Sequence, residues 1–296
     1  MRIVVSGGSG FLGQALTRAL RAHGHRVIVL TRRPTRDGDL LWSAGTDSGA
    51  WVAAVQAADV VINLAGEGVA DRRWSPARKQ AILQSRVHAT RTLATALNEA
   101  VTPAIFLSGS AIGIYGDCGD EEVTETHPPG TDFLAEVCVA WEQEAQAIAD
   151  VTRVVLLRTG IVLAEHGGAL AQMAMPFRFF VGGPVGSGDQ FMSWIHLDDW
   201  VGLVLWLLEN DTLRGPVNLT APQPVRNREL ARALGRAMGR PSLLPVPAFA
   251  LRLMLGELAD TALLSGQRVL PAAALAAGFS FRYPDVDSAL RAIYTR

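Results

Sequence analysis

The sequence predicts an α/β protein, with a doubly wound parallel sheet followed by a smaller, mostly helical C-terminal lobe. In residues 1–165, short apolar runs alternate with segments whose apolar residues recur at helical spacing, a rhythm typical of strand–helix–strand units. From about residue 166 this alternation stops, and residues 164–193 are rich in Gly, Met, Phe and Pro. We therefore expect a first domain at 1–165 and a smaller lobe at 166–296, with the chain returning to the main sheet around 190–220.

The expected strands of the first domain are short apolar runs, at residues 3–5, 27–30, 60–64, 105–107 and 154–157. Between them, apolar spacing predicts a helix that ends near residue 23, a long helix over roughly 76–100, and a helix carrying Val137, Trp141, Ala145 and Ile148. In the smaller lobe we expect a helix over 198–209 and helical structure from about 247. Strands joined in this way run parallel, with helices on both faces of the sheet.

Composition excludes several classes of partner. The chain has 27 basic and 28 acidic residues and a net charge of -1, so no overall positive field favours nucleic acid or an anionic membrane. No stretch reaches the roughly 20 apolar residues that span a bilayer, and the first apolar run is too short for a signal peptide. Cys118 and Cys138 lack a metal-ligand spacing, which predicts free thiols and no metal site. We expect a soluble, cytoplasmic protein.

A glycine-rich turn at residues 7–13 is the main functional signal, because it lies directly between the first expected strand and the first expected helix. In the dinucleotide-binding fingerprint, the first glycine allows a tight turn, the second lets the backbone approach a pyrophosphate, and the third lets the helix pack against the strand. The helix N-terminus adds unpaired N–H groups and a partial positive charge. A glycine-rich turn of an unrelated α/β fold is the alternative. The predicted cofactor-binding residues here are Gly7, Ser9, Gly10, Phe11, Leu12 and Gly13.

Two arginines at the end of the second expected strand indicate which dinucleotide is bound. A site for NAD usually places Asp or Glu about 20 residues after the fingerprint, on the ribose 2′-hydroxyl. Here that place reads Thr31-Arg32-Arg33, without an acid. Guanidinium groups pair well with a 2′-phosphate, so we predict NADP(H), bound in part by Thr31, Arg32 and Arg33. A solvated basic turn is the alternative.

The exit from the third expected strand adds to the predicted cofactor site. Asn63 is followed by Leu64, Ala65 and Gly66, and small residues there would let the chain pass close to the adenosine and diphosphate. We include Leu64, Ala65 and Gly66 among the cofactor-binding residues. Taken alone, the same residues fit an ordinary buried strand with a turn.

With these pieces, the sequence resembles an extended short-chain dehydrogenase/reductase. The resemblance rests on the glycine turn and on Asn63–Gly66, Ser108-Gly109-Ser110, Tyr115-Gly116, Leu157–Gly160 and Trp194–Asp199. More narrowly, the chain is similar to the uncharacterised "epimerase family" branch related to NAD(P)-dependent nucleotide-sugar epimerases, in features that include Arg73-Trp74, Arg78-Lys79, Ser85-Arg86, residues 133–142 and residues 266–279. The resemblance implies a Rossmann-type fold, a place for Ser108 beside the cofactor and, as a habit of the family, a homodimer.

The resemblance also implies a catalytic Ser or Thr after the fourth strand and a Tyr-x-x-x-Lys pair on the next helix. In that chemistry a tyrosinate takes a proton from a substrate hydroxyl while hydride moves to the nicotinamide, and the lysine lowers the tyrosine pKa from about 10. Ser108 and Ser110 fill the serine position, and a polar strand end is the alternative. No Tyr-x-x-x-Lys occurs in this chain, and the corresponding residues 133–138 read Phe-Leu-Ala-Glu-Val-Cys. The usual mechanism therefore cannot operate as written.

Other polar residues are candidates for the missing chemistry, and we predict catalytic roles for Ser110, Tyr115 and Arg86. Tyr115 could approach from its loop, and Arg86 falls near the place where the family often has an active-site Asn. Further titratable candidates are Glu67, Arg78, Lys79, Glu136 and Cys138. The plainer interpretation is a solvated helix face for the two cations and a core position for the cysteine.

Two further motifs are interpreted as structural. For His196 with Asp198 and Asp199 we favour a carboxylate that caps the following helix and an imidazole that orders the loop. Residues 182–188 are glycine-rich but lack the Gly-Lys-Ser/Thr of a phosphate loop. We expect them to form a flexible wall of the substrate cleft.

Three functions remain open at this point. The first is an NADP(H)-dependent oxidoreductase, epimerase or dehydratase that acts by hydride transfer on a small polar substrate such as a sugar. The second is a non-catalytic NADP(H)-binding protein that senses redox state or regulates a partner, which the missing Tyr and Lys favour. The third is a scaffold that has lost the cofactor, and the intact glycines together with Arg32 and Arg33 argue against it.

Overall fold

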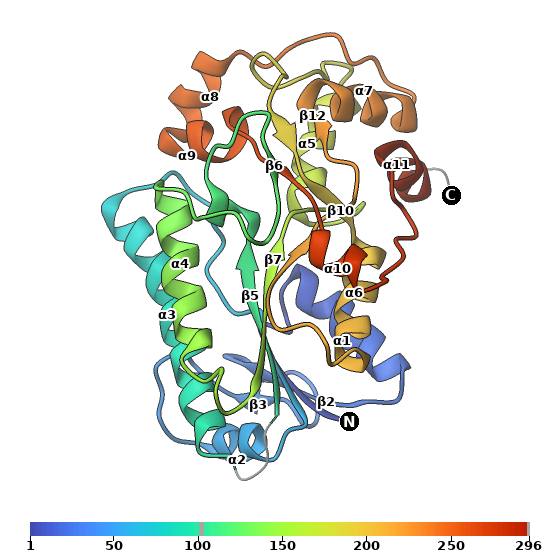
Figure 1. The fold of residues 1–296 in the computed structure, drawn as a ribbon. Coiled ribbons are helices and arrows are strands. Elements are labelled where there is room, and N and C mark those ends of the chain that lie inside the picture. The colour runs from blue at the N-terminus through green and yellow to red at the C-terminus, as the bar shows by residue number, and fades with distance from the viewer. Residues whose placement is uncertain (101–103, 295–296) are drawn as a thin grey trace.

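A seven-stranded sheet forms the centre of the computed structural model, which describes residues 1–100 and 104–294 (Figure 1). Every neighbouring pair of its strands is parallel. The fold class predicted from the sequence is confirmed. From one edge to the other the strands are β11 (Gly215–Leu219), β7 (Arg153–Thr159), β5 (Ile105–Ala111), β4 (Val60–Asn63), β1 (Arg2–Ser6), β2 (Arg26–Thr31) and β3 (Leu40–Leu41).

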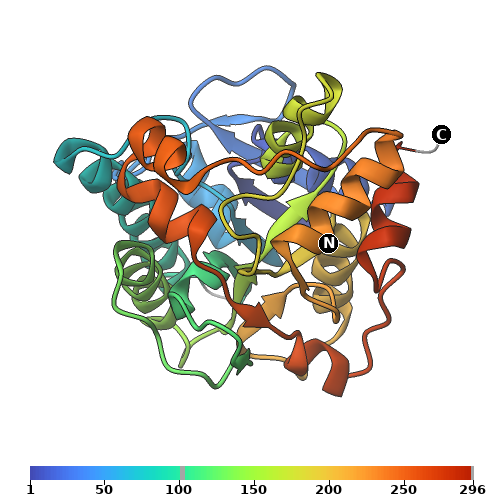
Figure 2. The same ribbon diagram turned by 90° about the horizontal axis from the view of Figure 1, so that it is seen from above.

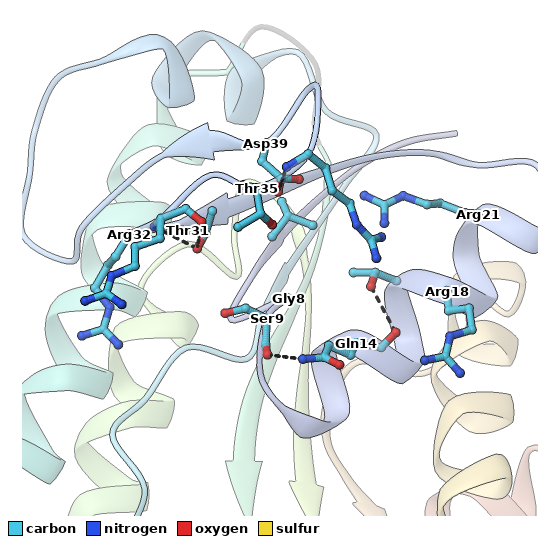
Figure 3. A pocket seen from close by; sticks show the side chains of 13 residues that line it. Gly8, Ser9, Gln14, Arg18, Arg21, Thr31, Arg32, Thr35 and Asp39 are labelled. Carbon is cyan, nitrogen blue, oxygen red and sulfur yellow. Dashed lines mark hydrogen bonds between the residues drawn. The ribbon is translucent and has the colours of Figure 1, made fainter.

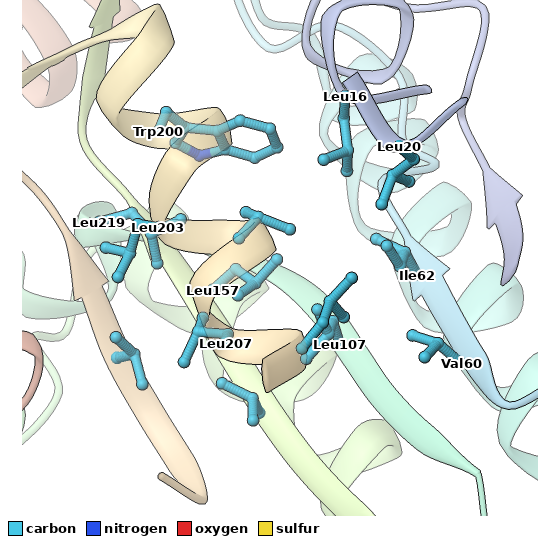
Figure 4. Close-up of a cluster of buried hydrophobic side chains, with 14 of the residues drawn as sticks. Leu16, Leu20, Val60, Ile62, Leu107, Leu157, Trp200, Leu203, Leu207 and Leu219 are labelled. Carbon is cyan, nitrogen blue, oxygen red and sulfur yellow. The ribbon is translucent and has the colours of Figure 1, made fainter. Parts of the chain in front are cut away.

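Helices cover both faces of this sheet. Successive residues of a strand point to opposite faces, so Ile3 and Val5 pack with Leu16 on one side while Val4 packs with Leu93 on the other. Figure 4 shows the cluster on the first side, where Leu16, Leu20 and Trp200 meet the sheet. The first side is covered by α1 (Phe11–Ala22) and α6 (Leu197–Glu209), and the second by α2 (Ala50–Gln56), α3 (Pro76–Asn98) and α4 (Phe133–Gln146).

The strand order reverses at β1, which pairs with β2 on one side and with β4 on the other. At such a switch point the connections leave in opposite directions and open a crevice at the carboxyl ends of the strands, where ligands bind. Buried polar side chains fix this point: the Ser6 hydroxyl donates to Asn63 Oδ1 at 2.6 Å, and Asn63 Nδ2 donates to Thr90 at 2.8 Å. The fold therefore places one ligand crevice between the glycine turn and the exit of β4.

The second half of the chain contributes to both parts of the molecule. α6 and β11 belong to the layers around the main sheet. A separate core unites α5 (Gly168–Arg178), α7 (Asn227–Met238) and α11 (Val286–Tyr294). Two two-stranded sheets contribute to this core: β8 (Ile161–Leu163) with β10 (Trp194–His196), and β9 (Phe191–Met192) with β12 (Val225–Arg226). A third, β6 (Glu122–Val123) with β13 (Arg268–Val269), belongs to a smaller cluster around Tyr115 and Cys138. The remaining helices are α8 (Ala248–Leu255), α9 (Glu257–Ala259) and α10 (Ala272–Ala276).

The segment α8–α9 lies beside the beginning of α3, as the view from above shows (Figure 2). Lys79 of α3 forms an ion pair with Glu257 of α9, with 2.6 Å between Nζ and Oε1. Just before α3, Arg73 donates to the carbonyl oxygen of Leu253 at 3.3 Å. These contacts join the two parts of the molecule at one side of the crevice. Among the helices of the described ranges, we find none with the length and apolar character needed to cross a membrane.

Candidate functional site

The glycine turn connects β1 to α1, and its shape depends on the missing side chains. Gly7 has a positive φ of 72°, and a Cβ built there would lie 2.5 Å from the Leu64 carbonyl carbon. A Cβ on Gly13 would lie 2.2 Å from the carbonyl oxygen of Gly7. Gly10 is the N-cap of α1 and offers no side chain to its N–H groups. The first-turn N–H groups are thus left for an anion at the helix N-terminus.

A cavity of about 300 Å³ opens between this turn and the exits of β2 and β4. It brings together most of the cofactor-binding residues predicted from the sequence, namely Gly7, Ser9, Gly10, Thr31, Arg32, Leu64, Ala65 and Gly66. Trp42, Ser43 and Ala44 also line it, and sequence analysis missed them because β3, the strand before them, has only two residues. The buried Trp42 ring packs edge-on against Trp51, with ring centroids 6.4 Å apart.

A second cavity, of about 910 Å³, adjoins the first and is lined by five arginines. Ser9, Thr31 and Arg32 line both cavities. In Figure 3, Arg32 lies on one side of the opening and Arg18 and Arg21 of α1 lie on the other. The only acid in the lining is Asp39, whose carboxylate accepts hydrogen bonds from the backbone of Thr35 and Arg36. The junction of the two cavities is therefore strongly positive, which suits a phosphate monoester. The five arginines are Arg18, Arg21, Arg32, Arg33 and Arg36.

Phe11, Leu12, Gly13 and Ser108 line neither of these cavities. The Phe11 ring lies against Gly168, where an added Cβ would come within 2.9 Å of it. Ser108 is fully buried in β5, and its hydroxyl contacts only the Gly109 carbonyl, at 3.4 Å, among the described residues. The cofactor-binding roles of these residues stay predictions.

Ser110 and Tyr115 take part in a buried polar network rather than facing the cavities. The Ser110 hydroxyl donates to Glu142 Oε1 at 2.6 Å. The Tyr115 hydroxyl donates to Asn218 Oδ1 at 2.7 Å and accepts from Arg158 at 2.9 Å. Burial raises the pKa of the Tyr115 phenol, against the opposing effect of Arg158, so the phenolate is disfavoured near neutral pH. Catalytic roles for Ser110 and Tyr115 stay predictions, and this geometry favours structural ones.

Arg158 is the centre of that network. Its guanidinium binds both carboxylate oxygens of Glu142, at 2.9 and 2.8 Å. Burial alone would lower the pKa of Arg158, but the hydrogen bonds and charges of Glu142 and Tyr115 together outweigh burial and raise it. Both side chains are 9% exposed, so the pair is charged, buried and fully bonded. It joins β7 to α4 below the crevice and holds Ser110 and Tyr115 in place.

Arg86, the third predicted catalytic residue, lies on α3 beside the exit of β4. A Cβ on Gly66 would lie 3.1 Å from its guanidinium carbon. The same guanidinium stands over the ring of Trp141, 5.2 Å from the centroid. Of the three predicted catalytic residues, Arg86 is thus the one whose side chain lies next to Gly66, which lines the smaller cavity.

The other titratable candidates differ sharply in their surroundings. Cys138 is buried in α4, and burial raises the pKa of its thiol to about 12, so it is a core residue without thiolate character. Arg78 binds Glu67 at 3.1 Å and the carbonyl oxygen of Gly68. Glu136 follows the N-cap of α4, where Asp132 Oδ1 accepts from the Ala135 N–H at 2.9 Å. None of these contacts points to proton transfer.

His196 itself caps α6, so our expectation of a carboxylate cap is wrong. Its Nδ1 accepts the backbone N–H of Asp198 at 3.0 Å. The buried Asp199 instead accepts the backbone N–H groups of Arg282 and Tyr283, at 2.8 and 2.9 Å. The carboxylate thereby ties the C-terminal segment to α6. Backbone N–H groups that are removed from water need a hydrogen-bond acceptor, and Asp199 supplies one to Arg282 and Tyr283.

Residues 182–188 pack closely against the segment before α8. Isolated bridges pair Gly182 with Ser242 and Val185 with Val246, and a Cβ on Gly183 would lie 2.1 Å from the Leu244 carbonyl oxygen. Backbone contact with that neighbouring segment explains Gly183, whereas the positive φ of Gly186 and Gly188 explains those two glycines. The predicted role of residues 182–188 as a wall of the substrate cleft stays a prediction.

Two family models match different stretches of the chain. The first is described as the NAD dependent epimerase/dehydratase family and matches residues 3–219. The chain belongs to this family. The second model, a domain of unknown function (DUF1731), matches residues 246–293, which include α8 and most of α11. The resemblance inferred from the sequence is therefore confirmed, and the family model spans the glycine turn and every strand of the main sheet except the first residue of β1.

Similar proteins carry the description "epimerase family protein". The chain is 42% identical over 302 residues to the chloroplastic SDR39U1 homolog of Arabidopsis thaliana, which covers 99% of this chain and 86% of that protein. It is 36% identical over 297 residues to SDR39U1 of Homo sapiens, with 99% of each covered. A crystal structure of the human protein (isoform 2) with NADPH matches it with a TM-score of 0.91 and 35% identity, over 100% of this chain and 99% of that one.

Proposed function

We propose that this chain binds NADP(H) and acts by hydride transfer on a small polar substrate, such as a sugar, as an oxidoreductase or epimerase. The observation that carries the cofactor assignment is the junction of the two cavities, where Arg32 lies between the glycine turn and a cavity with four more arginines. The NADPH bound to the human relative supports it.

The residues of the crevice fit a dinucleotide in three places. The first turn of α1, whose N–H groups have no side-chain cap, suits the diphosphate. Leu64, Ala65 and Gly66 leave the small cavity open for the adenosine. The Arg32 side chain is 80% exposed, and its one ion pair among the described residues, with Glu67, is long at 3.9 Å. Arg32 is therefore available to a 2′-phosphate.

Exchange of the two arginines that follow β2 tests this assignment. In Arg32→Asp and Arg33→Asp the new carboxylates would repel a 2′-phosphate, so NADPH affinity should fall by about tenfold or more, which is roughly 1.4 kcal/mol, while NADH affinity stays unchanged. Arg26→Asp is the matched control, because Arg26 is an exposed arginine at the opposite end of the same strand. Binding is measured by nucleotide fluorescence. An equal loss for both nucleotides, or no loss, would refute the 2′-phosphate assignment.

A second candidate function is a non-catalytic NADP(H)-binding sensor. It is favoured by α4, where Phe133, Val137 and Cys138 stand in the region that usually carries the Tyr and Lys. A structure with bound NADPH distinguishes the two functions. Polar side chains around the nicotinamide C4, placed to form hydrogen bonds with a substrate, would support the enzyme. An apolar environment around C4 would support the sensor.

A further inference from the structure

Three cations project from α3 near the crevice, and they are not equally paired. Arg78 binds the carboxylate of Glu67, and Lys79 binds that of Glu257. Arg86, two turns further along, forms no ion pair with any carboxylate of the described ranges. Its Nη1 donates to the carbonyl oxygen of Ile82 at 3.0 Å, one turn earlier in its own helix. Arg86 is thus the cation in this group that lacks a counter-ion.

The surroundings of Arg86 restrict where its guanidinium can lie. On one side is the indole of Trp141, which itself packs on β5, since a Cβ on Gly109 would lie 2.8 Å from the ring. On another side is the backbone of Gly66, just beyond β4. The guanidinium therefore lies over the carboxyl ends of β4 and β5. Stacking on an aromatic ring fixes arginine without using its N–H donors.

Burial makes the charged form of Arg86 less favourable than it is in water. Burial lowers its pKa, an effect that Cys138 partly opposes, and the neighbouring Arg78 lowers the pKa further against a smaller opposing effect of Glu67. Arginine nonetheless stays protonated in proteins. Among the described residues only one of its five N–H donors has a protein acceptor. A half-buried cation with so few protein partners has N–H donors available to an anionic ligand.

The order of the strands shows which part of a dinucleotide would lie near Arg86. The arginines that suit the 2′-phosphate follow β2, and the helix N-terminus that suits the diphosphate follows β1. The next strands in the sheet are β4 and then β5. A dinucleotide that extends from β2 across β1 reaches Arg86 at its far end, where the nicotinamide and the substrate meet. This step rests on the proposed NADP(H) binding.

We propose that Arg86, held by Trp141 and Gly66, binds an anionic oxygen group of the substrate, a carboxylate or a phosphate, at the nicotinamide end of the crevice. The planar guanidinium can donate two parallel hydrogen bonds to either group. The substrate class is then a small polar molecule with an acidic group. Arg78 and Lys79 are neutralised by their own carboxylates, so they add little to this selection.

Titration with two simple anions tests the site. Malonate represents a carboxylate ligand and inorganic phosphate a phosphate ligand, and each is titrated calorimetrically into the full chain with and without NADPH. We expect one of the two to bind the wild-type protein, and the one that binds identifies the acidic group. Arg86→Met, which keeps the apolar stem, should weaken that anion at least tenfold, and Arg86→Lys should restore part of the loss.

Arg91→Met is the matched control, because Arg91 lies on the same helix but pairs with Glu144 on the exposed side. It should bind the anion as the wild type does. NADPH affinity is measured by fluorescence titration for every variant. Failure of the protein to bind NADPH at all would count against the proposed function, while the anion titrations without NADPH would still test the role of Arg86. Anion binding that is absent from the wild type, or unchanged in Arg86→Met, would overturn the inference. So would a loss of NADPH affinity in Arg86→Met equal to the loss of anion affinity, since Arg86 would then belong to the cofactor diphosphate.

Discussion

At the scale of single residues, His196 shows how a motif that invites a catalytic interpretation can be structural. Its Nδ1 accepts a backbone N–H, so that nitrogen must keep its lone pair. The ring also stacks on Tyr283, with centroids 4.0 Å apart. Burial lowers the pKa of His196, against the opposing effects of Asp198 and Asp199. The folded protein therefore holds a neutral imidazole here.

This state of His196 has a pH dependence with a definite sign. Below the ordinary histidine pKa of about 6.5, His196 binds a proton in the unfolded chain but stays neutral in the folded chain. Stability is then lost as pH falls through that value, by at most about 1.4 kcal/mol per pH unit. His196→Asn keeps an acceptor for the Asp198 N–H but does not titrate. Urea unfolding should show a smaller loss of stability on acidification in His196→Asn than in the wild type. Equal losses would contradict the neutral cap.

Arg32 and Arg86 differ in how far sequence could predict them. The place of Arg32 was predictable because the spacing from the glycine turn to the end of β2 is constrained by one strand–helix–strand unit. Arg86 could be named as a candidate from the sequence, but its lack of a counter-ion could not be predicted. Glu67 and Glu257 lie at unrelated positions in the chain, and only the fold pairs them with Arg78 and Lys79. Pairing between distant side chains has no local signal in a sequence.

At the scale of elements, the C-terminal half of α4 carries a glutamate on each of two opposite sides. Glu142 points inward to Arg158 and Ser110, and both charged side chains of that pair are 9% exposed. Glu144, two residues later, pairs with Arg91, whose side chain is 59% exposed. The same residue type on one helix thus forms a buried and a surface ion pair, which allows a matched comparison.

We expect Glu142→Gln to destabilise the protein by about 3–5 kcal/mol, because it leaves the buried guanidinium of Arg158 without its counter-charge. Glu144→Gln should cost about 0–1 kcal/mol, since exposed ion pairs contribute little. The free energy of unfolding in urea measures both. Similar values for the two variants would mean that the Arg158 network does not stabilise the fold as its geometry indicates. Tyr115 and Ser110 would then be free for another role.

At the scale of the whole molecule, the strands and their pairing were only partly predictable from the sequence. β1, β2, β4, β5 and β7 are visible in the sequence because a strand buried on both faces is a continuous apolar run. β3, with two residues, and α2, with seven, are too short to show a period. The pairing of β11 with β7 joins segments about 60 residues apart, and sequence could indicate a return of the chain there but not its partner strand.

The same limit applies to the two cavities. Glycines and arginines predicted a dinucleotide site, and the structure brings most of those residues together. Trp42 and the arginines of α1 were not predicted to take part, because the α1 arginines read as an ordinary solvated helix face and the loop around Trp42 has no pattern. Their part in the site depends on how β2 and β3 pack beside α1.

We propose that the crevice at the β1 switch point binds NADP(H) and recognises its 2′-phosphate. Titration of the unmodified protein with NADPH and with NADH, under one buffer and ionic strength and followed by nucleotide fluorescence, measures this preference. We predict that NADPH binds at least about tenfold more tightly, which is roughly 1.4 kcal/mol. Equal affinities, or tighter binding of NADH, would contradict it.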